Sequence, residues 1–216
     1  MRHLLSVLLI GVTSLSLLAQ NYHGIDVSHH QDKIDWSLVA EDDVDFVYIK
    51  ATEGATYKDP CYDENMKGAI NSGLPVGAYH FFRMTSGATA QFSNFKAALN
   101  GYDFKLVPMI DVETSDGRPV KELQDSLDVF INLVKAEYDC APIIYGTQRS
   151  YNTYCAPKYN RYHLYIGRYS KFPPEIYGKG TYTIWQYSET ARVKGVSRPV
   201  DRCLFNSKYG IKDIMR

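Results

Sequence analysis

The segment LVPMIDVE, residues 106–113, is an apolar run that ends in two carboxylic acids. An apolar run of this length after a turn-like segment is typical of a buried strand. Alternate residues of a strand point to the same face, so we expect Asp111 and Glu113 to aim the same way. Burial and mutual repulsion would raise the pKa of at least one of these carboxyl groups, which suits a proton donor near neutral pH. The pair by itself fits the start of a solvated loop equally well, so the rest of the chain has to decide.

Seven further strands are predicted from short apolar stretches, at residues 23–28, 45–54, 75–82, 141–146, 163–169, 181–188 and 199–206. Helices are predicted between the early strands, at residues 35–40, 63–72, 88–100 and 119–138, and the last of them has the clearest apolar periodicity. Alternating strands and helices predict an α/β fold with parallel strands joined by crossovers. Eight strands favour a closed barrel over an open sheet, and the last three strands have no helices between them.

Polar residues gather toward the ends of these strands. They are Asp26, Lys50, Glu53, Tyr79, His80, Asp111, Glu113, Tyr145, Arg168, Trp185, Gln186, Tyr187 and Asp201. In a parallel barrel these ends meet on one face, where active sites are found. Acids surrounded by aromatic residues suit glycoside cleavage, in which positive charge develops on the sugar. This favours a catalytic role for the acids over the loop interpretation.

Other chemistries find little support in the sequence. The adjacent residues His29 and His30 would point apart, so we expect no metal and no cofactor. The chain has neither a G-x-S-x-G nucleophile elbow nor a glycine-rich phosphate loop. The 24 basic residues balance the 24 acidic ones, so nothing suggests a nucleic-acid partner.

Residues 1–19 begin with basic side chains and continue as an apolar run, which is the pattern of a secretory signal peptide. Cleavage after Ala19 would leave one domain, residues 20–216, and we expect it to be a monomer without stable membrane insertion. A short membrane anchor is the alternative, although the run falls short of the roughly 20 apolar residues that a membrane span needs. The expected location is secreted or periplasmic.

Four cysteines follow the predicted signal peptide, and their even number fits export. A bridge between Cys140 and Cys155 would close a loop of about 15 residues, worth roughly 3 kcal/mol. That pairing leaves Cys61 with Cys203. Free thiols are the alternative.

Eight segments together carry a resemblance: GIDVSHHQDKIDW, FVYIKATEG, PVGAYHFFR, VPMIDVE, IIYG, LYIGRY, IWQYS and PVDRCLFN. In this order they resemble the family 25 glycoside hydrolases, the Chalaropsis-type lysozymes, over nearly the whole mature chain. The resemblance implies a TIM-like barrel of eight strands with reduced helices, of (β/α)5(β)3 type. It also implies hydrolysis of the β-1,4 bond between N-acetylmuramic acid and N-acetylglucosamine in the glycan strands of peptidoglycan.

The resemblance further implies roles for individual residues. Glu113 would be the general acid, and we expect burial and an ionised Asp111 to keep it protonated. Asp111 would also position the substrate's N-acetyl group or stabilise developing charge. Asp26 and Asp201 would line the floor of the cleft. The candidates for sugar contact are Tyr79, Tyr145, Trp185 and Tyr187.

Two departures from the family pattern affect neighbouring positions. His29, His30 and Asp32 replace a more usual glycine-ending turn after the first strand, and Cys203 stands where the family more often has Asn. Neither change removes an acid.

Two other functions compete with the muramidase interpretation. A wall-binding module without catalysis is possible in principle, but the complete set of acids argues against it. A chitinase-like hydrolase would usually place its D-x-E motif in a longer acid series along the strand, which residues 107–110 do not supply.

Overall fold

The structure, a computed structural model, describes residues 21–216. Its strands are β1 (His23–Val27), β2 (Phe46–Glu53), β3 (Tyr57–Lys58), β4 (Val76–Phe81), β5 (Met109–Asp111), β6 (Ile143–Thr147), β7 (Leu164–Gly167), β8 (Ile184–Ala191) and β9 (Val200–Phe205). Its α-helices are α1 (Trp36–Ala40), α2 (Tyr62–Asn71), α3 (Ala88–Leu99), α4 (Val120–Tyr138) and α5 (Gln148–Tyr154). Short 3₁₀ helices cover His29–Gln31 and Ile211–Ile214.

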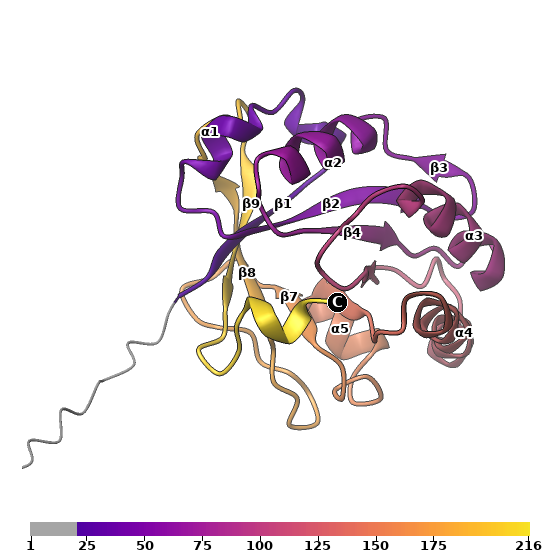
Figure 1. Cartoon of the computed structure of the whole chain (residues 1–216). Coiled ribbons are helices and arrows are strands. Elements are labelled where there is room, and N and C mark those ends of the chain that lie inside the picture. The colour runs from indigo at the N-terminus through magenta and orange to yellow at the C-terminus, as the bar shows by residue number, and fades with distance from the viewer. Residues whose placement is uncertain (1–20) are drawn as a thin grey trace, which may run out of the picture.

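The strands form one sheet in the order β1-β9-β8-β7-β6-β5-β4-β2-β3, and a pairing of β1 with β2 closes eight of them into a barrel. β3 is a two-residue strand that pairs with the end of β2 outside the ring. Helices α1 to α5 each follow one of the first five barrel strands, while β7, β8 and β9 are joined by loops. Figure 1 shows helices α1 to α4 beside the earlier strands, whereas β8 and β9 are connected by loops. The predicted eight-stranded barrel with reduced helices is therefore confirmed.

Alternation along the strands divides the core into an inner and an outer layer. On β2, Phe46 and Tyr48 belong to the cluster inside the barrel, whereas Val47 and Ile49 belong to the cluster beneath the helices. The same alternation on β5, β6 and β7 follows from the two-residue period of a strand. Successive residues thus have opposite surroundings, and this decides which polar side chains reach the interior.

The helices begin and end at the residues that their local sequence favours. Asp35 caps α1 by accepting hydrogen bonds from the backbone N–H groups of Ser37 and Leu38. Pro119 precedes the first turn of α4, and Gly73 follows α2 with a positive φ of 84°. These boundaries agree with the predicted helices to within one or two residues.

Some elements differ from the sequence-based predictions. The strand expected over residues 106–113 is shorter, because β5 pairs with its neighbours only from Met109 to Asp111. Helix α5 was not predicted, since its seven polar and aromatic residues show no apolar periodicity. The last strand, β9, runs antiparallel to both β8 and β1.

The antiparallel direction of β9 changes the reason why Asp201 reaches the active face. Asp201 lies near the start of its strand rather than at its end, and it pairs in register with Asp26 of β1. The start of an antiparallel strand lies at the same barrel mouth as the ends of the parallel strands. The expected position is therefore correct, although the expected strand direction is wrong.

The predicted disulfide pairs, Cys140 with Cys155 and Cys61 with Cys203, are absent, because all four cysteines are free. Cys203 lies in the cluster inside the barrel, whereas Cys61 precedes α2 on the outside. Cys140 packs against the inner cluster and Cys155 belongs to the outer one. Each predicted pair is divided between the two sides of the sheet, and a bridge needs Cβ atoms about 4 Å apart.

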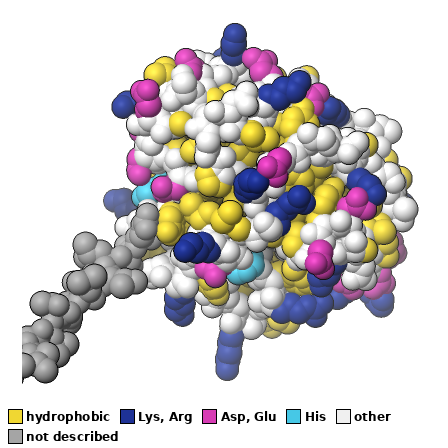
Figure 2. Space-filling view, viewed as in Figure 1, with side chains coloured by type: hydrophobic (Ala, Val, Ile, Leu, Met, Phe, Trp, Pro, Cys, Tyr) yellow, Lys and Arg dark blue, Asp and Glu magenta, His cyan; other side chains and the backbone are white. Residues whose placement is uncertain are grey.

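The predicted signal peptide, residues 1–19, lies outside the described part of the chain. Within residues 21–216, no helix combines the length and the apolar character needed to cross a membrane. On the face shown in Figure 2, basic and acidic side chains are interspersed rather than gathered by sign.

Candidate active site

A cavity of about 180 Å³ opens at the mouth of the barrel, where the parallel strands end. It is lined by Asp26, Ser28, His30, Lys50, Tyr79, Phe81, Met109, Asp111, Glu113, Tyr145, Tyr169, Gln186 and Asp201. All four predicted catalytic acids are in this set, contributed by β1, β9 and the end of β5. The barrel thus brings together carboxyl groups that lie up to 175 positions apart in the sequence, from Asp26 to Asp201.

The two acids of the D-x-E motif both face this cavity, as their spacing predicts. Asp111 is almost fully buried, and one of its oxygens, Oδ1, is buried with no hydrogen-bond partner among residues 21–216. Burial raises the pKa of Asp111 well above its ordinary value, and the nearby Glu113 raises it further. Burial, and then the charge of Asp26, raises the pKa of Glu113. Both groups therefore hold their protons to higher pH than exposed carboxyl groups do.

This order of pKa shifts differs from the expectation that an ionised Asp111 keeps Glu113 protonated. Asp111 is the more deeply buried acid of the two, so its charged form is the less favourable. The charged neighbour that raises the pKa of Glu113 is Asp26.

Asp26 is held by side chains from β7 and β8. The Tyr165 hydroxyl donates to Asp26 Oδ2 at 2.6 Å, and Gln186 Nε2 lies 3.1 and 3.0 Å from its two oxygens. The Gln186 carbonyl in turn accepts from the hydroxyls of Tyr145 and Tyr169 at 2.7 and 3.1 Å. These donors favour the ionised form of Asp26, although burial has the larger effect and raises its pKa.

Asp201 lies beside Asp26 across the paired strands β9 and β1. Burial raises the pKa of Asp201 to about 8, and the charge of Asp26 and a hydrogen bond between the two carboxyl groups act in the same direction. Two carboxyl groups this close cannot both ionise easily. The proton is therefore favoured on Asp201, and the tyrosine and glutamine donors favour the negative charge on Asp26.

Lys50 brings a positive charge to the acids. It follows Phe46 and Tyr48 on the inner face of β2 and lines the cavity. Its ammonium lowers the pKa of both Asp111 and Glu113, which partly offsets the effect of burial. Lys50 Nζ is itself held at 2.9 Å from Glu53 Oε2.

The four predicted sugar-contact residues separate into two groups. Tyr79 and Tyr145 line the cavity, together with Phe81 and Tyr169. Trp185 and Tyr187 flank Gln186 on β8, so they lie on the other face of that strand and do not line the cavity. Their rings contact each other edge-on at 5.8 Å, and Trp185 Nε1 donates to the Arg168 carbonyl at 2.8 Å. Sugar contact by these two side chains stays a prediction.

Several residues of the site were not singled out in the sequence as catalytic or sugar-contact candidates. Tyr165, Tyr169 and Gln186 complete the hydrogen-bond network around Asp26, and Ser28 and His30 line the wall after β1. Strand parity could have found two of them, since Gln186 lies two positions after the inward Ile184, and Tyr165 alternates with outward neighbours. No comparable signal marks Tyr169, which lies in the loop after β7.

The two adjacent histidines do not form a metal site. His29 Nδ1 lies 2.7 Å from the buried carboxylate of Asp59, whereas His30 lines the cavity. Within residues 21–216, no three His, Cys, Asp or Glu side chains are placed to hold a metal ion.

Carboxyl groups with raised pKa values share this cavity with tyrosine rings that can stack on sugars. Such a site can donate a proton to a glycosidic oxygen and stabilise positive charge on the sugar. A barrel with this site at its mouth belongs to the glycoside hydrolase class.

Comparison with known proteins identifies the family. Residues 25–196 match the model of glycosyl hydrolases family 25. Lysozyme M1 of Streptomyces globisporus is 36% identical over 198 residues, which cover 85% of this chain and 67% of that protein. The N,O-diacetylmuramidase of Chalaropsis sp. is 27% identical, with 86% of this chain and 96% of that protein covered. The crystal structure of the lysozyme from Streptomyces coelicolor superposes with a TM-score of 0.76 at 34% identity, covering 86% of this chain and 92% of that one. The chain belongs to glycosyl hydrolase family 25.

Proposed function

We propose that the protein is a lysozyme-type muramidase that hydrolyses the β-1,4 bond between N-acetylmuramic acid and N-acetylglucosamine in peptidoglycan. The observation that carries this proposal is the meeting of Asp111 and Glu113 with Asp26 and Asp201 in one cavity lined by tyrosines. The relatives named lysozyme and N,O-diacetylmuramidase support the choice of substrate. The predicted export of the chain is consistent with a substrate outside the cytoplasm.

In this proposal Glu113 donates the proton to the glycosidic oxygen. Its raised pKa favours the protonated acid at the pH where an ordinary glutamate would be ionised. Glu113 is also less buried than Asp111, so a leaving group at the cavity opening can approach it. As the C–O bond breaks, positive charge develops on the sugar, and the ionised Asp26 on the cavity floor stabilises it electrostatically.

Asp111 is assigned to the 2-acetamido group of the substrate. Its buried Oδ1 has no partner within residues 21–216, and it can accept a hydrogen bond from the acetamido N–H. That contact would orient the acetamido carbonyl to attack the anomeric carbon as an internal nucleophile, after which water opens the cyclic intermediate. The alternative is direct attack by water that a carboxylate activates. NMR of the first product separates the routes, since substrate assistance retains the β-anomer and direct attack inverts it.

Digestion of purified peptidoglycan tests the proposed function directly. Mass spectrometry of borohydride-reduced fragments should show reduced N-acetylmuramic acid at the new ends, which identifies the bond that was cut. Ends that carry N-acetylglucosamine, or faster turnover of chitin than of peptidoglycan, would contradict the muramidase assignment. Saturable binding to the wall without release of reducing ends would instead indicate the non-catalytic binding module.

The rate of wall hydrolysis should fall on the alkaline side as Glu113 loses its proton. Because burial and Asp26 raise the pKa of Glu113 above the ordinary value of 4.5, this loss should begin at a higher pH than an exposed glutamic acid would give. The measurement is kcat over a pH series on solubilised glycan, at constant ionic strength. An alkaline limb centred near the ordinary value would contradict the assignment of the acid.

Substituting Trp185 by Ala tests whether the glycan reaches the outer face of β8. If a sugar stacks on this half-buried ring, KM should rise by roughly two- to tenfold with a smaller change in kcat, since an aromatic contact contributes on the order of 0.5–1.5 kcal/mol. Thermal unfolding of the variant provides the control, because Trp185 also anchors the Arg168 carbonyl. An unchanged KM in a folded variant would contradict sugar contact.

A further inference from the structure

We propose that Arg83 is a positioning residue for the hydrolytic reaction, holding the loop after Glu113 on one side and Lys50 on the other through a chain of ion pairs. This inference rests on the proposed function. Neither Arg83 nor its carboxylate partners, Glu53 and Asp116, line the cavity. Any effect of Arg83 on catalysis must therefore pass through the residues that it holds.

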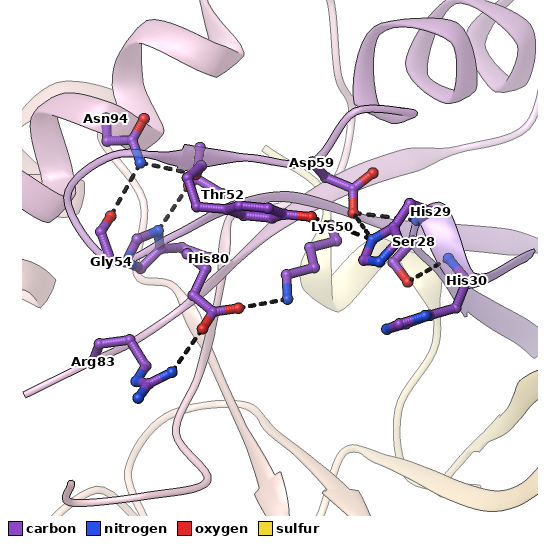
Figure 3. Close-up of polar contacts among 12 residues, drawn as sticks. Ser28, His29, His30, Lys50, Thr52, Gly54, Asp59, His80, Arg83 and Asn94 are labelled. Carbon is purple, nitrogen blue, oxygen red and sulfur yellow. Dashed lines mark hydrogen bonds and ion pairs between the residues drawn. The ribbon is translucent and has the colours of Figure 1, made fainter.

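The guanidinium of Arg83 bridges two carboxylates. Its NH1 group donates to Glu53 Oε1 at 2.8 Å. Its Nε and NH2 groups donate to the two oxygens of Asp116 at 3.1 and 2.9 Å, which is a bidentate contact. Only the planar fork of arginine can serve both carboxylates at once in this way. Figure 3 shows Arg83 beneath the carboxylate that also accepts from Lys50.

Asp116 connects Arg83 to the catalytic loop. It lies three positions after Glu113 and adopts a positive φ of 48°, which a residue with a side chain rarely occupies. Beyond Arg83, its carboxylate accepts from the backbone N–H of Met84 at 2.7 Å, while its own N–H donates to Thr114 Oγ1. The side chain is only 12% exposed. The turn after Glu113 is thus fixed against the segment that follows β4.

Lys50 forms the other end of the ion-pair chain. Lys50 Nζ donates to Glu53 Oε2, the oxygen that Arg83 leaves free, and its side chain is only 13% exposed. From this position its ammonium acts on Asp111 and Glu113. The charges alternate along this series of ion pairs, from Lys50 through Glu53 and Arg83 to Asp116. Each charged group therefore has a neighbour of opposite charge. A partly buried network of this kind fixes geometry better than an isolated surface pair does.

One end of this series of ion pairs, Lys50, thus lines the cavity, and the other end, Asp116, lies three residues after the cavity residue Glu113. Asp116 fixes the backbone that follows Glu113, the proton donor. Glu53 fixes Lys50, whose positive charge lowers the pKa of Glu113. A shift of about 1 Å in a catalytic group can cost on the order of a hundredfold in rate. Loosening Arg83 should consequently affect the chemical step more than substrate binding.

Arg83→Lys tests this inference, because lysine keeps the positive charge but cannot bridge both carboxylates. We expect kcat on solubilised peptidoglycan to fall roughly 10- to 100-fold while KM changes by less than about threefold. We also expect the alkaline limb of kcat to move to higher pH, since a displaced Lys50 no longer offsets burial and the charge of Asp26, which raise the pKa of Glu113. A purely structural role would lower the unfolding temperature without moving this limb.

Asp116→Asn and Lys121→Gln complete the design. Asp116→Asn keeps an oxygen for the Met84 N–H but loses the ion pair, so it should lower kcat like Arg83→Lys, and the double variant should lose little more. Lys121→Gln breaks the exposed Lys121–Asp125 pair on α4 and should leave kcat unchanged. Wild-type kcat in folded Arg83→Lys, or additive losses in the double variant, would overturn the inference. An inactive wild-type protein would instead overturn the proposed function.

Discussion

Glu113→Gln is expected to lower kcat on peptidoglycan by roughly a hundred- to ten-thousand-fold, the contribution typical of general acid catalysis. The glutamine side chain has nearly the same shape but cannot release a proton at any accessible pH. The leaving sugar would then depart as an unprotonated alkoxide. The loss is measured as the initial rate of reducing-end release at saturating concentrations of solubilised glycan. A slow variant can be assayed at a higher enzyme concentration.

The fold should tolerate this change. Burial and Asp26 both raise the pKa of Glu113, so an ionised carboxylate at this position is unfavourable and its removal costs little stability. Glycan binding should persist in the inactive variant, which a pull-down with insoluble peptidoglycan can measure. Glu41→Gln, at an exposed position after α1, is the matched control and should retain full activity. If folded Glu113→Gln kept most of its wall-lysing activity, Glu113 would not be the acid.

Asp111→Asn is expected to lower kcat by roughly a hundred- to a thousand-fold, comparable to the loss of a preorganised electrostatic contact. The asparagine amide keeps a carbonyl oxygen that can accept from the acetamido N–H, but it cannot ionise during the reaction, so it cannot stabilise a positively charged acetamido intermediate. Stability should change little, because burial already favours the neutral form of Asp111 and asparagine has nearly the same shape. Thermal unfolding and steady-state kinetics on the same preparation separate these effects.

A substrate comparison shows whether Asp111 acts through the acetamido group. On a glycan without its 2-acetamido groups, wild-type protein should lose activity, and Asp111→Asn should lose little beyond that, since both changes remove the same step. Asp125→Asn, at an exposed site on α4, is the control for the substitution itself. Independent, multiplicative losses would indicate that Asp111 acts on water or on the sugar directly.

Much of the site follows from periodicity. The i, i+2 spacing of Asp111 and Glu113 sets both on one face wherever the strand lies, and the structure places both in the cavity. The two-residue period of β4 also explains why His80 does not line the cavity. It follows the inward Tyr79, so it turns to the outer layer, stacks on Phe130 at 4.9 Å, and burial lowers its pKa to about 4.

Other features depended on contacts between distant segments. On β8, Trp185 and Tyr187 are the predicted sugar-contact residues, whereas Gln186 is the residue of this strand that lines the cavity. Gln186 faces inward because it hydrogen-bonds to Asp26, 160 positions away in the sequence. No local pattern in the sequence encodes that partner.

The cysteines show the same limit. Spacing alone made Cys140 and Cys155 a reasonable pair. In the closed barrel, however, Cys140 packs against the inner cluster and Cys155 belongs to the outer one. The Arg83 bridge could not be foreseen either, since its carboxylates lie 30 residues before it and 33 after it.

The sequence by itself determined the eight strands, the helices between the early ones and the acids of the catalytic motif, because these depend on local periodicity and capping. Only the tertiary structure decided the direction of β9, the partners of Asp26, the free state of the cysteines and the order of the carboxyl pKa values. These depend on which side of the closed barrel each side chain occupies and on how deeply it is buried, and both are set by segments far apart in the chain.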